Sequence, residues 1–134
     1  MDPVCHFELP YDDRDRISAF YQSAFGWQLQ KLGEEMGNYV VATTSSGDVK
    51  PDAHRGAIGG GFFPRKDDWP AQYPSVVVAV QDIQASMKKI RTAGGEVLGE
   101  PMPIPGVGLY VSFYDTERNR LSILQPSDEK PPHA

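Results

Sequence analysis

The chain has 134 residues, of which 40% are hydrophobic, and this length predicts one compact domain or two small similar halves. Its formal net charge of −5 comes from 18 acidic and 13 basic residues, and no basic cluster exceeds two neighbours. We therefore expect neither nucleic acid nor an anionic membrane surface as a partner. No apolar run approaches membrane-spanning length, and the N-terminus lacks the pattern of a signal peptide. Together with a single cysteine, Cys5, these features predict a cytoplasmic protein without an internal disulfide.

The first half of the chain reads as a strand, a helix and three further strands. From Val4 to Leu9, apolar residues alternate with a mixed set that includes His6 and Glu8, which is typical of a strand with two different faces. Asp12 or Asp13 can cap the following helix, because a carboxylate accepts hydrogen bonds from free backbone N–H groups. Gly26 ends that helix. The three further strands are expected at residues 27–32, 38–44 and 57–63.

The same order of elements begins again after a linker that is rich in charge and proline. A short apolar run from Val76 to Val80 predicts a buried strand. Asp82 can cap a second helix, which Gly94 and Gly95 end. The three strands that follow are expected at residues 96–102, 108–114 and 120–125.

The two halves are in register, which indicates an internal repeat. Asp13 and Asp82 are 69 residues apart, and so are Gly26 and Gly95. We therefore predict an α+β fold of two βαβββ modules that form a curled mixed sheet around a cleft, with the helices outside. The expected boundaries within a single domain 1–134 are about 1–65 for the first module, 66–73 for the linker, 74–126 for the second module and 127–134 for a flexible tail.

Three stretches carry a resemblance to a known family: "HFELPYDDRDRISAFYQSAFGW", "VVVAVQDIQASMKKIRTAGGEV" and "VGLYVSFYDTERNRLSIL". From about Val4 to Gln125 the chain resembles the vicinal oxygen chelate superfamily, which includes glyoxalase I, bleomycin-resistance proteins, fosfomycin-resistance enzymes and extradiol dioxygenases. It looks similar to the compact glyoxalase-like members, which implies the fold rather than one particular reaction.

The resemblance also implies where a metal ion would bind. Metal-using members hold a divalent ion at one position on the first strand and one on the last strand of each half. Carried over to this chain, these positions are His6, Ser75 and Ser122, and the fourth expected strand contains no Asp, Glu, His or Cys. His6 is the only matching position. Because a catalytic zinc or iron site needs about three protein ligands, the usual site is not expected. A different metal site built with Glu8 or His54 stays open, and the cofactor is unknown.

His6 and Glu8 lie two residues apart on the first strand, so their side chains point the same way, roughly 7 Å apart. As a cleft-lining pair, His6 would act as acid or base near neutral pH, with Glu8 raising its basicity. Alternatively, both are hydrogen-bonded inner residues without a catalytic role, and Arg120 could be the partner of Glu8.

A second set of polar residues lies on the last two strands. Tyr110 and Ser112 alternate with apolar residues, so one face of this strand carries hydroxyl groups. If that face lines the cleft, small-molecule contacts are expected from Ser75, Tyr110, Ser112, Arg120 and Ser122, with Phe62 as an apolar wall beside Phe63 and Trp69. The alternative is ordinary sheet packing.

These observations favour a glyoxalase-like protein with a small molecule bound in its cleft, either a binding protein or a metal-independent enzyme. The resemblance to compact relatives also implies a symmetric homodimer. Three alternatives stay open: a divalent-metal-dependent lyase, isomerase or dioxygenase with atypical ligands, a non-catalytic protein that sequesters a drug or metabolite, and an interaction module whose cleft is filled by its own side chains.

Overall fold

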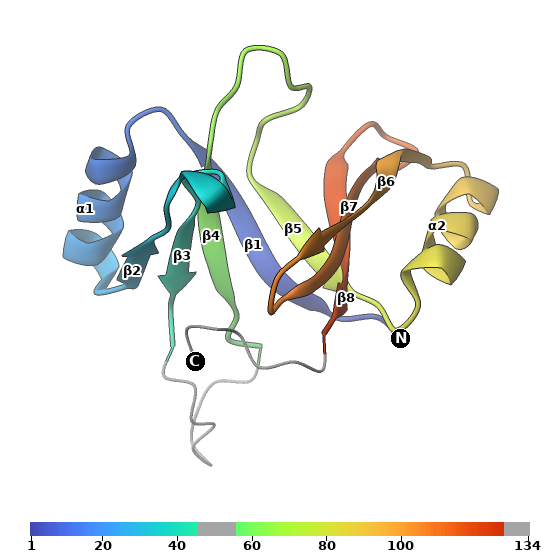
Figure 1. The fold of residues 1–134 in the computed structure, drawn as a ribbon, viewed down its shortest axis with the longest axis horizontal. Coiled ribbons are helices and arrows are strands. Elements are labelled where there is room, and N and C mark those ends of the chain that lie inside the picture. The colour runs from blue at the N-terminus through green and yellow to red at the C-terminus, as the bar shows by residue number, and fades with distance from the viewer. Residues whose placement is uncertain (46–55, 128–134) are drawn as a thin grey trace. The chain divides into compact units, whose positions relative to one another are not determined.

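The structure, a computed structural model, describes residues 1–45 and 56–127. These residues form eight strands and two α-helices, shown in Figure 1. The chain divides into two compact units. We call them the first unit, His6–Pro74, and the second unit, Ser75–Ala134 together with Met1–Cys5.

The first unit has a four-stranded mixed sheet in the order β2-β3-β4-β1. β1 and β4 are parallel, and the β3 pairings with β2 and β4 are antiparallel. A short 3-10 helix, η1, lies between β2 and β3, in the stretch that separates the strands expected at residues 27–32 and 38–44. The bounds are β1 (Val4–Tyr11), α1 (Arg14–Phe25), β2 (Gln28–Lys31), η1 (Glu34–Met36), β3 (Val40–Thr43) and β4 (Gly59–Pro64).

The second unit repeats this arrangement with the strand order β5-β8-β7-β6. β5 and β8 are parallel, and the other pairings are antiparallel. Met1–Cys5, which include the start of β1, belong to this unit. The N–H of Ala79 donates to the carbonyl of Pro3, just before β1, at 2.9 Å. The predicted α+β fold of two βαβββ modules is therefore confirmed. The bounds are β5 (Ser75–Ala79), α2 (Ile83–Thr92), β6 (Glu96–Ile104), β7 (Gly108–Tyr114) and β8 (Arg120–Pro126).

Both helices begin at the aspartates that the repeat predicts. The backbone N–H of Arg16 donates to Asp13 Oδ1 at 3.0 Å, and that of Ala85 donates to Asp82 Oδ1 at 3.1 Å. Each cap satisfies one backbone donor that has no partner within the helix. Asp13 rather than Asp12 is thus the N-cap of α1.

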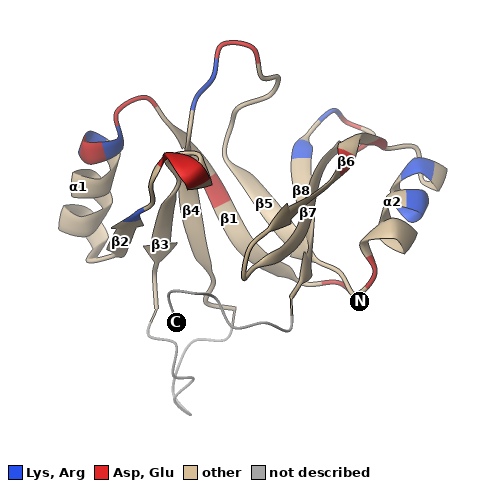
Figure 2. Cartoon of the chain, in the orientation of Figure 1, with Lys and Arg blue, Asp and Glu red and all other residues tan. Residues whose placement is uncertain are grey.

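The helix ends match less closely than the predicted pairing of Gly26 with Gly95. Gly26 has a left-handed backbone with φ of 72°, whereas in the second unit the left-handed residue at the helix end is Gly94, with φ of 101°. The repeat is therefore out of register by one residue at this point. The N–H of Gly95 instead donates to the carbonyl of Ile90 at 2.9 Å. Figure 2 shows the basic residues of α2, whose last-turn cations lie near the negative end of the helix dipole.

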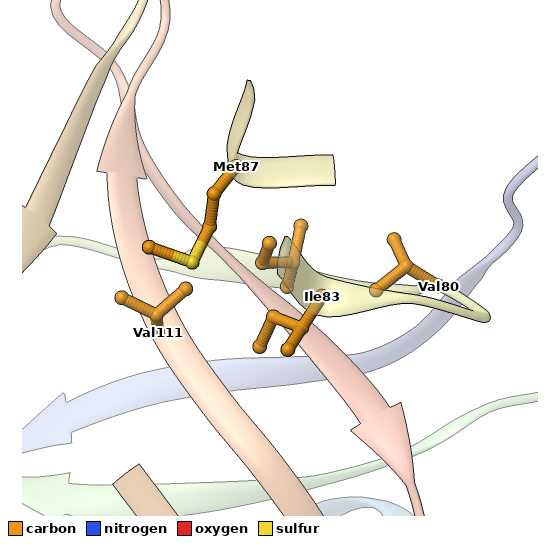
Figure 3. Packing of buried hydrophobic residues seen from close by; sticks show 5 residues of the cluster. Val80, Ile83, Met87 and Val111 are labelled. Atoms are coloured by element: carbon orange, nitrogen blue, oxygen red, sulfur yellow. The ribbon is translucent and has the colours of Figure 1, made fainter. Parts of the chain in front are cut away.

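Each helix packs one apolar face against the sheet of its own unit. In the first unit the core is aromatic: the Tyr21 ring on α1 stacks on Trp27 at 4.6 Å between centroids and lies 5.3 Å from Phe62. Phe7 and Leu9 of β1 pack against this core, as the alternation in the sequence predicts. In the second unit the core is aliphatic, as Figure 3 shows, and its buried residues are Val80, Ile83, Met87, Val111 and Ile123.

Within the described residues we find no helix that is both long enough and apolar enough to span a membrane.

Candidate functional site

His6 and Glu8 lie on the face of β1 that points away from the aromatic core. Their strand neighbours across the parallel pairing are Gly59 and Gly61 of β4. Glycine has no side chain, so this stretch of β4 leaves space beside the imidazole and the carboxylate. The sequence therefore positions two titratable groups next to a bare strand surface.

Tyr39 fills part of this space and joins the two groups. Its hydroxyl oxygen lies 2.8 Å from His6 Nε2, and its hydroxyl donates to Glu8 Oε2 at 3.2 Å. The Tyr39 ring lies over Gly61, where an added Cβ would overlap the ring atoms. The imidazole and phenol rings are nearly parallel, with an angle of 18° between their planes. His6, Tyr39 and Glu8 thus form a hydrogen-bonded triad, a name we keep below.

The environment of the triad favours the neutral form of the imidazole. Burial lowers the pKa of His6 from its ordinary value, and the negative charge of Glu8 raises it only in part. A neutral imidazole has one nitrogen that donates a hydrogen bond and one that accepts. Near neutral pH, His6 can therefore accept a proton from a neighbouring group.

The predicted hydroxyl face of the second unit also forms one hydrogen-bonded cluster. Ser122 Oγ donates to the Tyr110 hydroxyl at 2.7 Å and lies 2.9 Å from Ser112 Oγ. Arg120 Nη2 donates to Ser112 Oγ at 3.5 Å, and Ser75 Oγ donates to the backbone carbonyl of Arg120 at 2.7 Å. The apolar neighbour of Tyr110 and Ser112, Val111, is in the core on the helix side, so the hydroxyl groups lie on the opposite face.

Phe62 does not have the position that the sequence analysis gives it. Neighbouring residues of a strand point to opposite faces, and Phe62 lies on the helix side with 0% of its surface exposed. The residue that pairs with Phe62 on β3 is Val40, which is also buried. The prediction of Phe62 as an apolar wall for a ligand is therefore wrong, because this side chain belongs to the core of the first unit.

The positions that the family uses for a metal ion carry groups that do not fit one. The hydroxyls of Ser75 and Ser122 are poor ligands for a divalent ion, and both are engaged in the hydrogen bonds just described. Strand pairing gives the fourth position. Ser122 on β8 pairs with Val77 on β5, and in the first unit the equivalent pair is Gly61 on β4 with Glu8 on β1. Gly61 is therefore the fourth position. A glycine offers no side-chain ligand at all.

The remaining side chains of the described part of the chain give the same answer. In residues 1–45 and 56–127, no three His, Cys, Asp or Glu side chains come together in a way that could hold a metal ion. His54, a possible ligand in the alternative metal site, lies outside the described residues.

Sequence reasoning missed Tyr39, although the repeat contains a signal for it. Val41 pairs with Gly61 in the first unit, and Ser112 pairs with Ser122 in the second. Tyr39 and Tyr110 each lie two residues before these paired positions, so they are equivalent. Aligning the two halves by strand pairing, rather than by one constant offset, would have singled out both tyrosines.

The comparisons with known proteins agree with this fold. A family profile described as Glyoxalase/Bleomycin resistance protein/Dioxygenase superfamily matches residues 4–123. A glyoxylase-like domain-containing protein of Didymella fabae is 27% identical over 123 residues, which cover 90% of this chain and 91% of that protein. A putative glyoxylase of Mycobacterium bovis is 31% identical over 92% of this chain, which spans only 44% of that relative's length.

Solved structures show the same likeness at lower identity. A Streptomyces coelicolor methylmalonyl-CoA epimerase variant in complex with 2-nitronate-propionyl-CoA superposes with a TM-score of 0.67 and 19% identity. The match covers 97% of this chain and 98% of that one. At this identity the likeness shows the fold alone.

Proposed function

Because the chain belongs to the Glyoxalase/Bleomycin resistance protein/Dioxygenase superfamily, we propose that it binds a small organic molecule on the polar faces of its sheets. We propose further that His6 and Glu8 are the groups that act on this molecule, through proton transfer by protein side chains. The observation that carries the proposal is the triad, in which Tyr39 joins an imidazole and a carboxylate in a half-buried place.

The chemistry of the triad suits a general acid or base. A half-buried imidazole with a lowered pKa is neutral at physiological pH and is ready to accept a proton. The carboxylate of Glu8 stabilises the positive charge that then develops on the ring. Neither step requires a metal ion, and the donor types at the family's metal positions support a mechanism without one.

The hydroxyl cluster of the second unit supports a second group of ligand contacts. Within the second unit, we propose that Ser75, Tyr110, Ser112, Arg120 and Ser122 form hydrogen bonds to oxygen atoms of a small-molecule ligand. Hydroxyl groups both donate and accept, and a guanidinium group binds carboxylates and phosphates with two parallel hydrogen bonds. We also propose four features that the sequence predicts. They are the cleft, the single-domain organisation with its module boundaries, the symmetric homodimer and the cytoplasmic location.

The test combines native mass spectrometry of freshly purified protein with thermal-shift measurements across a metabolite library. We expect a co-purified or added small molecule to raise Tm, and His6→Gln and Glu8→Gln to remove that shift. The matched control is Glu34→Gln, which removes an exposed carboxylate of η1 and should leave the shift unchanged. Mass spectrometry also reports the subunit number.

Three results would overturn parts of the proposal. Stoichiometric bound metal that is lost in His6→Ala would favour a metal-dependent lyase, isomerase or dioxygenase. Ligand binding that survives both substitutions without any product would favour sequestration. No thermal shift with any compound, and no co-purified ligand, would contradict ligand binding itself and favour an interaction module.

A further inference from the structure

We propose that Tyr39 is a positioning residue that holds neutral His6 with its proton on Nε2, so that Nδ1 is the ring atom that meets the ligand. This inference rests on the proposed function and deepens it. It specifies which atom of the imidazole reacts and what the bound molecule must offer to that atom.

The hydrogen count of the triad fixes the direction of its hydrogen bonds. A phenol has one proton, and Tyr39 donates it to Glu8 Oε2. The Tyr39 oxygen is also 2.8 Å from His6 Nε2, a normal distance for an N–H···O hydrogen bond. With the phenol proton used, Nε2 must supply the proton of this second contact. The reverse direction would place a phenol lone pair against the Glu8 carboxylate oxygen, with no hydrogen between two acceptors.

The other ring nitrogen of His6 is accessible. Nδ1 has no hydrogen-bond partner among the described residues. Among the described residues, Ser18 Oγ is the one fully buried side-chain polar atom that lacks a partner. Nδ1 also lacks a partner and is not such an atom, so it keeps contact with solvent. In the Nε2–H form, Nδ1 carries a lone pair. A ligand that meets it must therefore offer a hydrogen, on nitrogen, on oxygen or on an acidic carbon.

The backbone around Tyr39 holds the phenol in this place. The carbonyl of Tyr39 accepts a hydrogen bond from the N–H of Leu32 at 2.8 Å. The N–H of Tyr39 donates to the carbonyl of Met36 at 3.3 Å. The Tyr11 hydroxyl donates to the carbonyl of Asn38 at 2.7 Å. With Gly61 leaving space for the ring, the hydroxyl is set between His6 and Glu8 before any ligand arrives.

The second unit shows what the same tyrosine does without this arrangement. Tyr110 is equivalent to Tyr39, but it accepts a hydrogen bond from Ser122. The position equivalent to His6 is Ser75, whose hydroxyl donates to a backbone carbonyl. The imidazole and its positioning phenol are therefore features of the first unit alone among the described residues.

The experiment is a two-bond ¹⁵N–¹H correlation spectrum of ¹⁵N-histidine-labelled protein, which distinguishes the two imidazole tautomers. It is recorded above the pKa of His6, and His6→Gln assigns the His6 signals among the three histidines. We expect the Nε2–H pattern in the unaltered protein. Tyr39→Phe keeps the ring but removes the hydroxyl, and should lower the Nε2–H to Nδ1–H ratio about fivefold, as expected for the loss of one typical hydrogen bond.

The matched control is Tyr110→Phe, the equivalent change in the second unit, which should leave the His6 signals in place. An Nδ1–H pattern in the spectrum of the unaltered protein would by itself overturn the proposal. So would His6 signals that do not change in a folded Tyr39→Phe protein. Because the spectrum is recorded without ligand, its failure is distinguishable from a failure of the ligand-binding test.

Discussion

Where the first unit has Gly61, the second unit has Ser122, and the equivalent tyrosines beside them behave differently. Tyr39 lies across the glycine and reaches His6 and Glu8 on the neighbouring strand. Tyr110 instead bonds to the Ser122 hydroxyl that occupies the corresponding space. The side chain at this position and the contact of the tyrosine beside it thus both differ between the two units.

This difference teaches how a duplicated scaffold can carry two kinds of chemistry. The strand pairings are the same in both units, so equivalent residues have equivalent neighbours. On the first strand, His6 and Glu8 of the first unit correspond to Ser75 and Val77 of the second, 69 residues later. The first unit therefore has titratable groups where the second has a hydroxyl and a buried apolar side chain.

The cores differ as well, and substitutions there should have the largest effects. Phe62→Ala in the aromatic core should lower the free energy of unfolding by about 3–5 kcal/mol, and Met87→Ala in the aliphatic core by about 2–5 kcal/mol, because each removes buried surface and leaves a cavity. Urea denaturation followed by far-UV circular dichroism measures both changes.

The same experiment asks whether the two units unfold together. Both tryptophans, Trp27 and Trp69, lie in the first unit, so fluorescence reports on that unit. Because β1 has residues in both units, we expect Met87→Ala to shift the fluorescence and dichroism midpoints equally. A Met87→Ala protein whose fluorescence midpoint stays unchanged would show that the units unfold independently.

Much of the fold could be predicted from the sequence, because its signals are local. Strand alternation and the two capping aspartates depend on residues that are close in the chain. The strand predicted at Gly108–Tyr114 is observed with the same bounds, and Asp13 and Asp82 both cap helices as predicted. The 3-10 helix at Glu34–Met36 was missed, because such a short turn has no periodic pattern.

The site was predicted less well, because its geometry depends on pairing between distant strands. His6 and Glu8 could be placed on one face by alternation alone. The role of Tyr39 depends on its crossing over Gly61, a contact between residues 22 positions apart that no local pattern reports. Phe62 was assigned to the wrong face because the register of β4, a strand with three glycines, could not be read from its composition.

Exchanging the small side chains directly tests the central difference between the units. Gly61→Ala adds a methyl group that overlaps the Tyr39 ring, so the phenol must leave His6 and Glu8. We expect a loss of about 1–3 kcal/mol in the free energy of unfolding, as for other overpacked sites. The histidine spectrum of this variant should show the same change in tautomer ratio as Tyr39→Phe.

Two further variants make the interpretation specific. In Gly61→Ala with Tyr39→Ala, the added methyl no longer meets a ring, so the combined loss should be smaller than the sum of the two single losses. Ser122→Ala in the second unit removes hydroxyl contacts without creating an overlap, and it should leave the His6 signals unchanged. Additive losses in the double variant would mean that Tyr39 does not rest on Gly61.

The helix caps should give smaller and nearly equal effects, because here the units match. Asp13→Ala and Asp82→Ala each remove one capping hydrogen bond, and each should cost about 1 kcal/mol in thermal or urea denaturation. Asp12→Ala is the control beside the first cap. It removes only the exposed ion pair with Arg65, so it should cost less than either cap. A larger cost for Asp12→Ala would reverse the assignment of the cap.

The pH dependence of stability should show the smallest difference, because two causes oppose each other at His6. Burial lowers the pKa of His6, and the charge of Glu8 partly restores it. The net folded pKa lies below the value of about 6.5 expected for an unfolded chain, so the unfolded state binds more protons below that pH. The stabilisation is complete above about pH 6.5 and is lost as the pH falls through the folded pKa.

His6→Gln should therefore lose less stability than the unaltered protein between about pH 7 and pH 5, as measured by urea denaturation at several pH values. The other two histidines are present in both proteins, so the difference between the two curves reports on His6. The carboxylates of Asp15 and Asp115, whose pKa values are lowered by hydrogen bonds, titrate below this range. Parallel curves would mean that the His6 imidazole takes up protons as easily in the folded chain as in the unfolded one. The first unit would then lack the half-buried neutral ring that distinguishes its polar face from the hydroxyl cluster of the second.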